Sequence, residues 1–374
     1  MNMETGIETG RNPASSNWTF WNARVSKSKI MEGIDQAPPV RQGEGASQTR
    51  KTIIMEEVKE GHGRKPKLTI EEQIEHLKSK GVTFGLCAEA EAARILSEQD
   101  HYFRLAAYRV LFPKRIGGER DGEYAGLDFG HLVDLAGIDQ ELRGFLLPLT
   151  LDVENAAKTK LVERITEDSD EDGYSVFVDY LAHLNHGDRN RRRGEISRLE
   201  NDAYLGPLVA RYPIKEMPAW VFLELSSFGA FADFYLFCSE RWDDPRMRDE
   251  HYLLRRVSSL RNAAAHSSAM INGLGVGSNS LESRPPAMVS SALAEIGVSR
   301  RLRRARLRNP RILQMTSLAF AHGHFVPGQK RCAAAQRLEA LKRRAKTNAD
   351  WYAHSNALVA SYRFLEKVFD DWLA

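Results

Sequence analysis

The segment at residues 261–266, Arg-Asn-Ala-Ala-Ala-His, combines residue types that can cut RNA without a metal ion. A histidine titrates near neutral pH and can accept or donate a proton. An arginine keeps its charge and can bind two phosphate oxygens at once. An apolar helical pattern precedes the segment, and little explains three polar residues on such a helix unless they are used. Arg261, Asn262 and His266 are therefore the candidate catalytic residues.

The spacing of these residues limits how they can work together. On an ideal helix Asn262 and His266 share a face, whereas Arg261 and His266 lie about 140° apart. Either the helix ends near His266, or the long arginine side chain curls around it, or a second subunit completes the site. The alternative is structural: the arginine and the histidine would form hydrogen bonds to neighbouring helices in a polar core.

Short motifs elsewhere in the chain form three blocks. The blocks comprise residues 65–73 with 101–108, then Phe129 with 139–143 and 152–154, then 218–220, 224–229, 260–268 and Asn272. In this order they resemble the Abi-like (abortive infection) family of bacterial phage-defence proteins, a branch of the HEPN superfamily. The likeness spans residues 64–275 and continues more faintly at residues 309–313.

The resemblance implies an all-α fold, a HEPN-like helical bundle with additional helices, and a homodimer that brings two arginine–histidine motifs together. It also implies a phage-defence toxin that is a metal-independent endoribonuclease and needs no cofactor. The RNA 2′-hydroxyl would be the nucleophile, His266 would move a proton, Arg261 would neutralise the phosphorane, and Asn262 would orient the histidine or the phosphate. The products would be a 2′,3′-cyclic phosphate and a 5′-hydroxyl. The alternative is a non-catalytic helical module that binds RNA or a partner.

The family pattern also suggests supporting residues and partners. Asp139, Arg143 and Glu154 fall on a long helix that should pack against the motif helix. Asp139 and Arg143 are four residues apart, which also fits an ion pair within one helix. Besides RNA and a second copy of the chain, the expected partner is a protein or RNA antitoxin.

The net charge of +3 is too small to indicate nucleic-acid binding by itself, but the basic residues are clustered. Basic runs occupy residues 189–193, 300–308 and 342–346. In the second run, Val298, Leu302 and Ala305 predict an apolar stripe that leaves the arginines exposed to a phosphate backbone. The candidate RNA-binding residues are Arg191, Arg192, Arg300, Arg301, Arg304 and Arg308. A solvated helix face, or one paired with acids of a partner, is the alternative.

The composition is that of a globular protein in a reducing compartment. The chain has 374 residues, 42% of them hydrophobic and 28% charged, and its three cysteines show no paired spacing. No signal peptide is visible, and the most apolar stretch, residues 220–238, contains two acids, so we expect a cytoplasmic protein without a membrane span. The pairs His183/His186 and His322/His324 lack further ligands, so we expect surface or loop histidines and no metal site.

Periodicity predicts an almost entirely helical chain. We expect a poorly ordered extension at residues 1–63, for which Met55 is an alternative start, then a helical core at 64–272, a flexible loop at 273–286, and C-terminal helices at 287–374 that pack on the core. A helix at residues 128–166 should kink or split at Pro148. The other helices are expected near residues 69–80, 88–97, 102–110, 174–184, 194–205, 218–238, 251–271, 287–308, 311–321 and 329–373.

Overall fold

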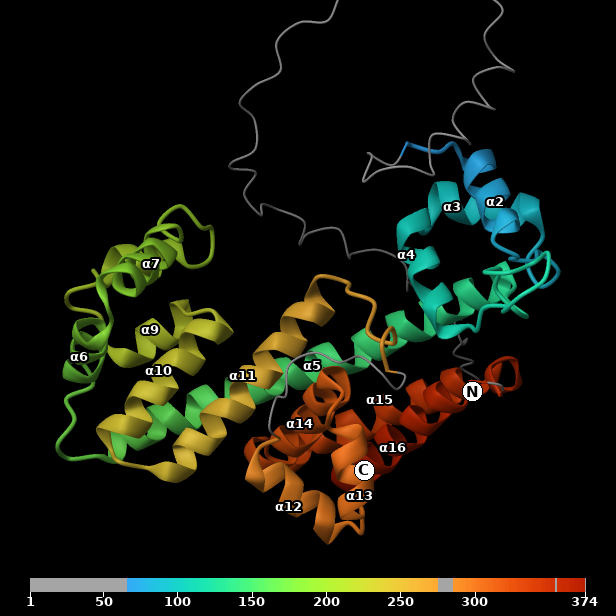
Figure 1. The fold of residues 1–374 in the computed structure, drawn as a ribbon. Coiled ribbons are helices and arrows are strands. Elements are labelled where there is room, and N and C mark those ends of the chain that lie inside the picture. Colours follow the sequence, from blue (N-terminus) through green and yellow to red (C-terminus); the bar gives the residue numbers. More distant parts are fainter. Residues whose placement is uncertain (1–65, 275–284, 354, 374) are drawn as a thin grey trace, which may run out of the picture. The chain divides into compact units, whose positions relative to one another are not determined.

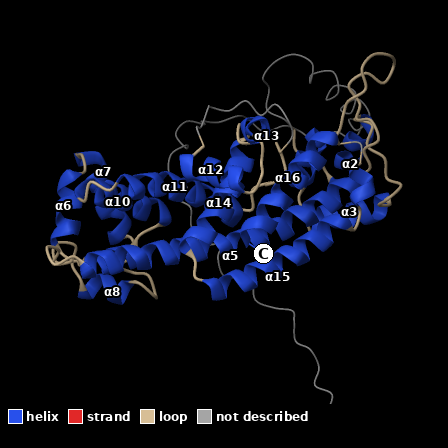
Figure 2. Cartoon of the chain, turned by 90° about the horizontal axis from the view of Figure 1, so that it is seen from below, coloured by secondary structure: helices blue, strands red, loops and turns tan. Residues whose placement is uncertain are grey.

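A computed structural model describes residues 66–274, 285–353 and 355–373 of the chain. The expected extension at residues 1–63 and most of the expected loop at 273–286 lie outside the described residues. The chain from Lys67 onward forms one compact unit. Every regular element within its described part is a helix, which confirms the all-α prediction (Figure 1, Figure 2).

The helices up to and including the motif helix come first along the chain. They are α2 (Ile70–Ser79), α3 (Glu89–Glu98), α4 (Tyr102–Ala106), the 3₁₀ helix η2 (Ala107–Leu111), α5 (Phe129–Glu167), α6 (Ser175–His183), α7 (His186–Ser197), α8 (Gly206–Arg211), α9 (Ala219–Leu225), α10 (Phe228–Arg241) and α11 (Pro245–Ala265). The remaining ones are α12 (Ala287–Glu295), α13 (Arg300–Arg306), α14 (Pro310–Phe325), α15 (Gly328–Lys346), the 3₁₀ helix η3 (Ala349–Tyr352) and α16 (Asn356–Leu373).

Capping residues set several of these boundaries. Thr69 and Glu72 form the expected capping box at the start of α2, in which each side chain accepts a hydrogen bond from the other residue's backbone N–H. The predicted helix at residues 194–205 is wrong. The helix instead starts after Asn185, which caps it by accepting a hydrogen bond from the N–H of Asp188. The arginines at 189–193 therefore lie inside α7.

Helix α5 continues through Pro148, so the predicted split is wrong. The proline removes one N–H, which would otherwise bond to the carbonyl of Gly144. A Cβ at Gly144 would have no atom within 4 Å, so this turn faces open space and can accommodate the proline ring. On its other sides α5 packs against α11, α14 and α15, and these neighbours hold the two halves of the helix in line.

Three predicted helices are each divided in the structure. Residues 218–238 form α9 and α10, because Ser227 caps a new helix by accepting a hydrogen bond from the N–H of Ala230. Residues 287–308 form α12 and α13, separated by Gly297 in the left-handed region (φ +77°) and by the capping residue Ser299. Residues 329–373 form α15, η3 and α16. Within the described chain, no helix is long and apolar enough to cross a membrane.

Helices α5 and α11 run antiparallel and form the centre of the unit. Arg164 of α5 forms an ion pair with Asp244, which precedes α11, and Asp139 of α5 binds the chain beyond the other end of α11. Helix α14 packs against both, α15 packs against α5, and α16 packs against α14 and α15 (Figure 1). The C-terminal helices therefore share one core with α5 and α11.

Two of the four histidines considered as metal ligands lie as expected. His183 and His186 are exposed, but His322 is fully buried in α14 and the surface prediction for it is wrong. Burial lowers the pKa of His322, although the Asp152 carboxylate lies 3.7 Å from its Nε2 and favours the charged form. The packing of α14 against α5 and α11 buries this residue, which lies on the same helical face as the buried Leu318 and Phe325.

The buried His322 predicts a dependence of stability on pH. Its lowered pKa means that the unfolded chain binds the proton more readily, so this contribution is present above pH 6.5, the usual pKa of a histidine in an unfolded chain, and is lost as the pH falls below it. We expect His322→Leu to remove a slope of at most about 1.4 kcal/mol per pH unit from the free energy of unfolding. Urea unfolding between pH 5 and pH 8 measures this. The exposed His186→Leu variant should keep the wild-type slope, and an unchanged slope in His322→Leu would contradict the assignment.

Candidate functional site

The motif helix α11 ends at the candidate histidine. His266 is the C-cap, its backbone N–H bonds to the Asn262 carbonyl at 2.9 Å, and Ser267 adopts a positive φ of 54°. The Ser267 and Ser268 N–H groups then bond back to Ala264 and Ala263 at 3.2 and 3.0 Å. This is a Schellman arrangement, which satisfies the last carbonyls of the helix. Of the three arrangements left open by the sequence, the structure therefore has a helix that ends at His266.

The three candidate residues lie together on the end of this helix but do not all touch. Asn262 and His266 are exposed, and Arg261 is half-buried. Arg261 donates a hydrogen bond from Nη1 to Asn262 Oδ1 at 3.2 Å, and no bond joins it to His266 within the described residues. Its Nε is buried without a hydrogen-bond partner. One copy of the chain therefore presents the arginine and the histidine as separate groups, with the asparagine between them.

Asp139 fixes the chain immediately after the motif. Its carboxylate, fully buried in α5, accepts a hydrogen bond from the Ile271 N–H at 2.7 Å and from the Arg143 guanidinium. Burial raises the pKa of the Asp139 carboxyl, and the Ile271 N–H and Arg143, which favour the charged form, offset only part of that effect. The i, i+4 ion pair expected from the spacing is present, and it supports the segment that follows His266.

Two residues from the start of α14 hold the same segment. Arg311 donates to the carbonyls of Ala269 and Met270, and Asn309 donates to that of Gly273. Neither was predicted as a site residue, although the faint likeness at residues 309–313 marked this region. The sequence signal is the pair Asn309-Pro310, which is typical of a helix start. Asn309 is 36 residues away in the sequence from Gly273, whose carbonyl it binds.

Glu154 is placed apart from the motif. It forms an ion pair with Lys158 at 3.1 Å, and Lys158 also donates to the carbonyl of Ser226 between α9 and α10. At 1.5 Å per residue, Glu154 is about 22 Å along α5 from Asp139. The structure thus connects Asp139 and Arg143 to the motif segment, whereas Glu154 pairs with Lys158, which binds the chain between α9 and α10.

The arginines of α13 and of the turn that follows it divide into two groups. Arg300, Arg301, Arg304 and Arg308 are exposed, and none has an acidic partner among the described residues. Arg303 and Arg306 turn inward and donate to the Val298 carbonyl and the Ser361 hydroxyl. The predicted stripe is wrong in part, because Val298 is buried but Leu302 and Ala305 are exposed. Leu307, which directly follows α13, is also buried.

The α7 arginines differ from the expectation. Arg191 is exposed but forms an ion pair with Asp188 at 2.7 Å. Arg192 is buried, with only 4% of its surface exposed, and it pairs with Glu195 and Asp233. Arg192 is therefore a structural residue that joins α7 to α10, and its prediction as an RNA-binding residue is corrected.

Most cations of the third basic run, residues 342–346, are also paired. Lys342 binds Glu339 and Asp370, and Arg344 binds Asp134 at 2.9 Å. Of the three basic runs, the one on α13 therefore has the most arginines available to a ligand. In addition, no group of three histidine, cysteine or carboxylate side chains that could hold a metal ion occurs in the part of the chain that the structure describes.

The comparison with protein families gives a match that ends at the motif segment. Residues 95–272 match the Abi-like protein family. The Abi-like region thus starts in α3 and includes α5, α11 and the residues after His266 that Asp139 and Arg311 hold in place. This supports the resemblance to the Abi-like family over residues 95–272, and it is consistent with a role in abortive infection. No curated protein and no solved structure matches the chain.

Proposed function

We propose that this protein is a phage-defence toxin that stops growth by cutting RNA as a metal-independent endoribonuclease of the HEPN type. The observation that carries the proposal is the end of α11, where His266 and Asn262 are exposed beside Arg261 and the following chain is fixed from α5 and α14. A rigid helix end that presents a proton carrier, an amide and a guanidinium is suited to the transfer of a phosphoryl group within RNA. The cytoplasm, where its RNA substrates are found, is the proposed location.

RNA supplies its own nucleophile, so the protein needs to move protons and neutralise charge. His266 removes the proton of the 2′-hydroxyl or gives one to the departing 5′-oxygen. Arg261 binds the phosphorane oxygens, and Asn262 orients the histidine or the phosphate. Acid–base catalysis of this kind contributes about 10²–10⁴-fold, and the stabilisation of developing charge contributes a comparable factor. The products are a 2′,3′-cyclic phosphate and a 5′-hydroxyl.

A second copy of the chain would complete this site. In one copy Arg261 bonds to Asn262 rather than to His266. The motif contains a single histidine, so one helix end cannot supply both a general acid and a general base. Two helix ends that face one another across a two-fold axis would place the arginine of one copy beside the histidine of its partner. A protein or RNA antitoxin that covers the exposed helix ends would keep the toxin dormant.

The exposed arginines of α13 and of the turn after it are proposed to bind the RNA backbone next to this site. Arg308 directly precedes Asn309, which is bonded to the motif's downstream segment, so RNA held on α13 lies close to the helix end. We expect that a variant with Arg300, Arg301, Arg304 and Arg308 all replaced by glutamine binds single-stranded RNA more weakly. The slope of log affinity against log salt should fall by up to about 3, since each lost phosphate contact removes about 0.7.

A charge-matched variant controls this prediction. It replaces four exposed cations far from α13 in the sequence, Lys114, Arg115, Arg120 and Lys215, by glutamine. Filter binding from 50 to 300 mM salt should give nearly the wild-type slope for this control. Equal slopes for the two variants would show that α13 makes no specific contribution and that only net charge matters.

The proposal is tested by incubating the purified full-length protein with a mixed RNA pool in the presence of EDTA and by analysing the new ends. Cyclic phosphates and 5′-hydroxyls are the expected products. The alternative is a non-catalytic module that binds phosphate with Arg261 and His266. It predicts salt-sensitive RNA binding without new RNA ends, both in the presence and in the absence of infected-cell extract. Absence of both cleavage and salt-sensitive binding would exclude an RNA-directed function.

A further inference from the structure

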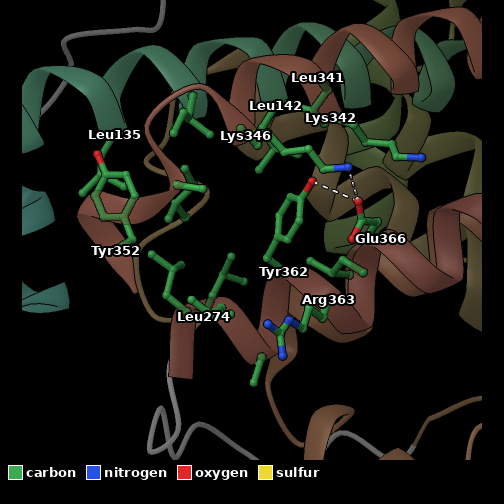
Figure 3. Close-up of a pocket in the computed structure, with 18 of the residues that line it drawn as sticks. Leu135, Leu142, Leu274, Leu341, Lys342, Lys346, Tyr352, Tyr362, Arg363 and Glu366 are labelled. Atoms are coloured by element: carbon green, nitrogen blue, oxygen red, sulfur yellow. Dashed lines mark hydrogen bonds and ion pairs between the residues drawn. The ribbon is translucent and has the colours of Figure 1, made fainter. Parts of the chain in front are cut away.

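A cavity of about 760 Å³ lies between the C-terminal helices and α5 (Figure 3). Its walls come from α5, α15, η3 and α16, together with Ile271 and Leu274 from the segment that follows the motif. This volume falls within the range of about 300–1,000 Å³ that is typical of sites for small molecules. None of the candidate catalytic residues lines it, so it is separate from the site on α11.

Most of the cavity lining is apolar. Leu135, Leu142 and Leu341 are among the side chains that line it (Figure 3). Phe369 lines it as well. Tyr352 also lines it, but its hydroxyl donates a hydrogen bond to the Asp134 carboxylate at 2.6 Å and is not available to a ligand. Walls of this kind offer no set of donors and acceptors for a base or a sugar, whereas an alkyl chain needs none.

Charged groups gather at one edge of the cavity, and only some of them are neutralised. Lys342 binds Glu339 and Asp370 at 2.8 and 3.0 Å. Lys346 lies 3.5 Å from Glu366, longer than a normal hydrogen bond, and the hydroxyl of Tyr362 donates to the same carboxylate (Figure 3). Arg363 is exposed, lines the cavity and has no acidic partner among the described residues. The lining therefore offers one available guanidinium, one ammonium group that is weakly paired with Glu366, and one exposed carboxylate, Asp350, that has no basic partner among the described residues.

We infer that this cavity binds a free fatty acid, with the alkyl chain among the leucines and the carboxylate on Arg363. A guanidinium can bind both oxygens of a carboxylate, and the apolar walls remove the chain from water. The charge at the edge and the apolar interior thus match the two parts of this one ligand. This inference is independent of RNA cleavage, because no residue of the candidate catalytic set takes part.

The bound chain would contact the segment that follows the motif. Ile271 lines the cavity, and its backbone N–H is the group that bonds to Asp139. Ile138, which precedes Asp139, lines the cavity as well. We expect a bound fatty acid to hold these two elements together and to slow hydrogen exchange of the Ile271 amide. Such a contact would give the ligand a route to influence the neighbouring helix end.

The inference is tested by calorimetric titration of the full-length protein with octanoate, decanoate and dodecanoate below the concentrations at which they form micelles. Each two-carbon extension should tighten binding by about 10- to 15-fold, which follows from the transfer of two methylenes out of water, until the cavity is full. The alcohols of equal chain length should bind more weakly. No saturable binding, or equal binding of the acids and the alcohols, would overturn the inference.

Variants at the edge of the cavity separate this site from general surface adsorption. Arg363→Gln should weaken dodecanoate binding about tenfold or more, as expected for the loss of a charge-assisted hydrogen bond. Ala349→Trp adds bulk at an exposed lining position without disturbing the core, and it should reduce binding as well. The exposed Arg300→Gln serves as the control and should bind as wild type does. Equal loss in Arg300→Gln, or unchanged binding in both edge variants, would show that the cavity is not the site.

Discussion

Replacement of His266 by alanine is expected to reduce RNA cleavage by about 10²–10⁴-fold, because it removes the group proposed to move the proton. The side chain is exposed and its role in ending α11 belongs to its backbone, so the free energy of unfolding should stay close to that of the wild type. RNA affinity should also change little, since the arginines remain. The measurement is the rate of cleavage in EDTA, with affinity and unfolding determined on the same samples.

Two further variants make this prediction specific. His186→Ala removes another exposed histidine, on α7, and should cleave at the wild-type rate. Arg261→Lys keeps the charge but loses the planar fork that binds two phosphate oxygens, so we expect a lower rate with the same products. Cleavage by His266→Ala at the wild-type rate would place the activity elsewhere in the chain, or in a contaminant, and would refute the assignment of the site.

Replacement of Asp139 by alanine is expected to lower the free energy of unfolding by about 3–5 kcal/mol, the cost of leaving a buried charge without its partner. Asp139 is fully buried, and its loss leaves the Arg143 guanidinium unpaired and the Ile271 N–H without an acceptor. The segment after His266 should loosen as well, so the Ile271 amide should exchange faster. Urea unfolding followed by circular dichroism, together with hydrogen exchange, measures both effects.

A surface ion pair provides the comparison for this prediction. Asp371→Ala breaks an exposed pair with Lys367 on α16 and should cost about 0–1 kcal/mol. The double variant Asp139→Leu with Arg143→Met removes both buried charges and should recover part of the loss, although the Ile271 N–H stays unpaired. A cost for Asp139→Ala as small as that for Asp371→Ala would mean that this ion pair does not hold the segment in place.

Short-range features of the sequence determined the helical class, several helix boundaries and the motif itself. The capping box at Thr69 and Glu72 involves residues three positions apart, and the ion pair of Asp139 with Arg143 involves residues four apart. Such interactions depend on local spacing and can be predicted without knowledge of the fold. The end of α11 at His266 was one of the arrangements left open, and the sequence alone did not select it.

Burial was decided by the tertiary structure alone. Arg191 and Arg192 are neighbours in a basic run, yet one is exposed and the other is buried between α7 and α10. His322 was expected at the surface or in a loop, and the packing of α14 against α5 and α11 buries it. The bond from the Ile271 N–H to Asp139 spans 132 residues of sequence, and the apolar cavity has walls from four helical elements and a loop. These features arise from contacts between distant segments, and no local pattern of residue types specifies which segments will meet.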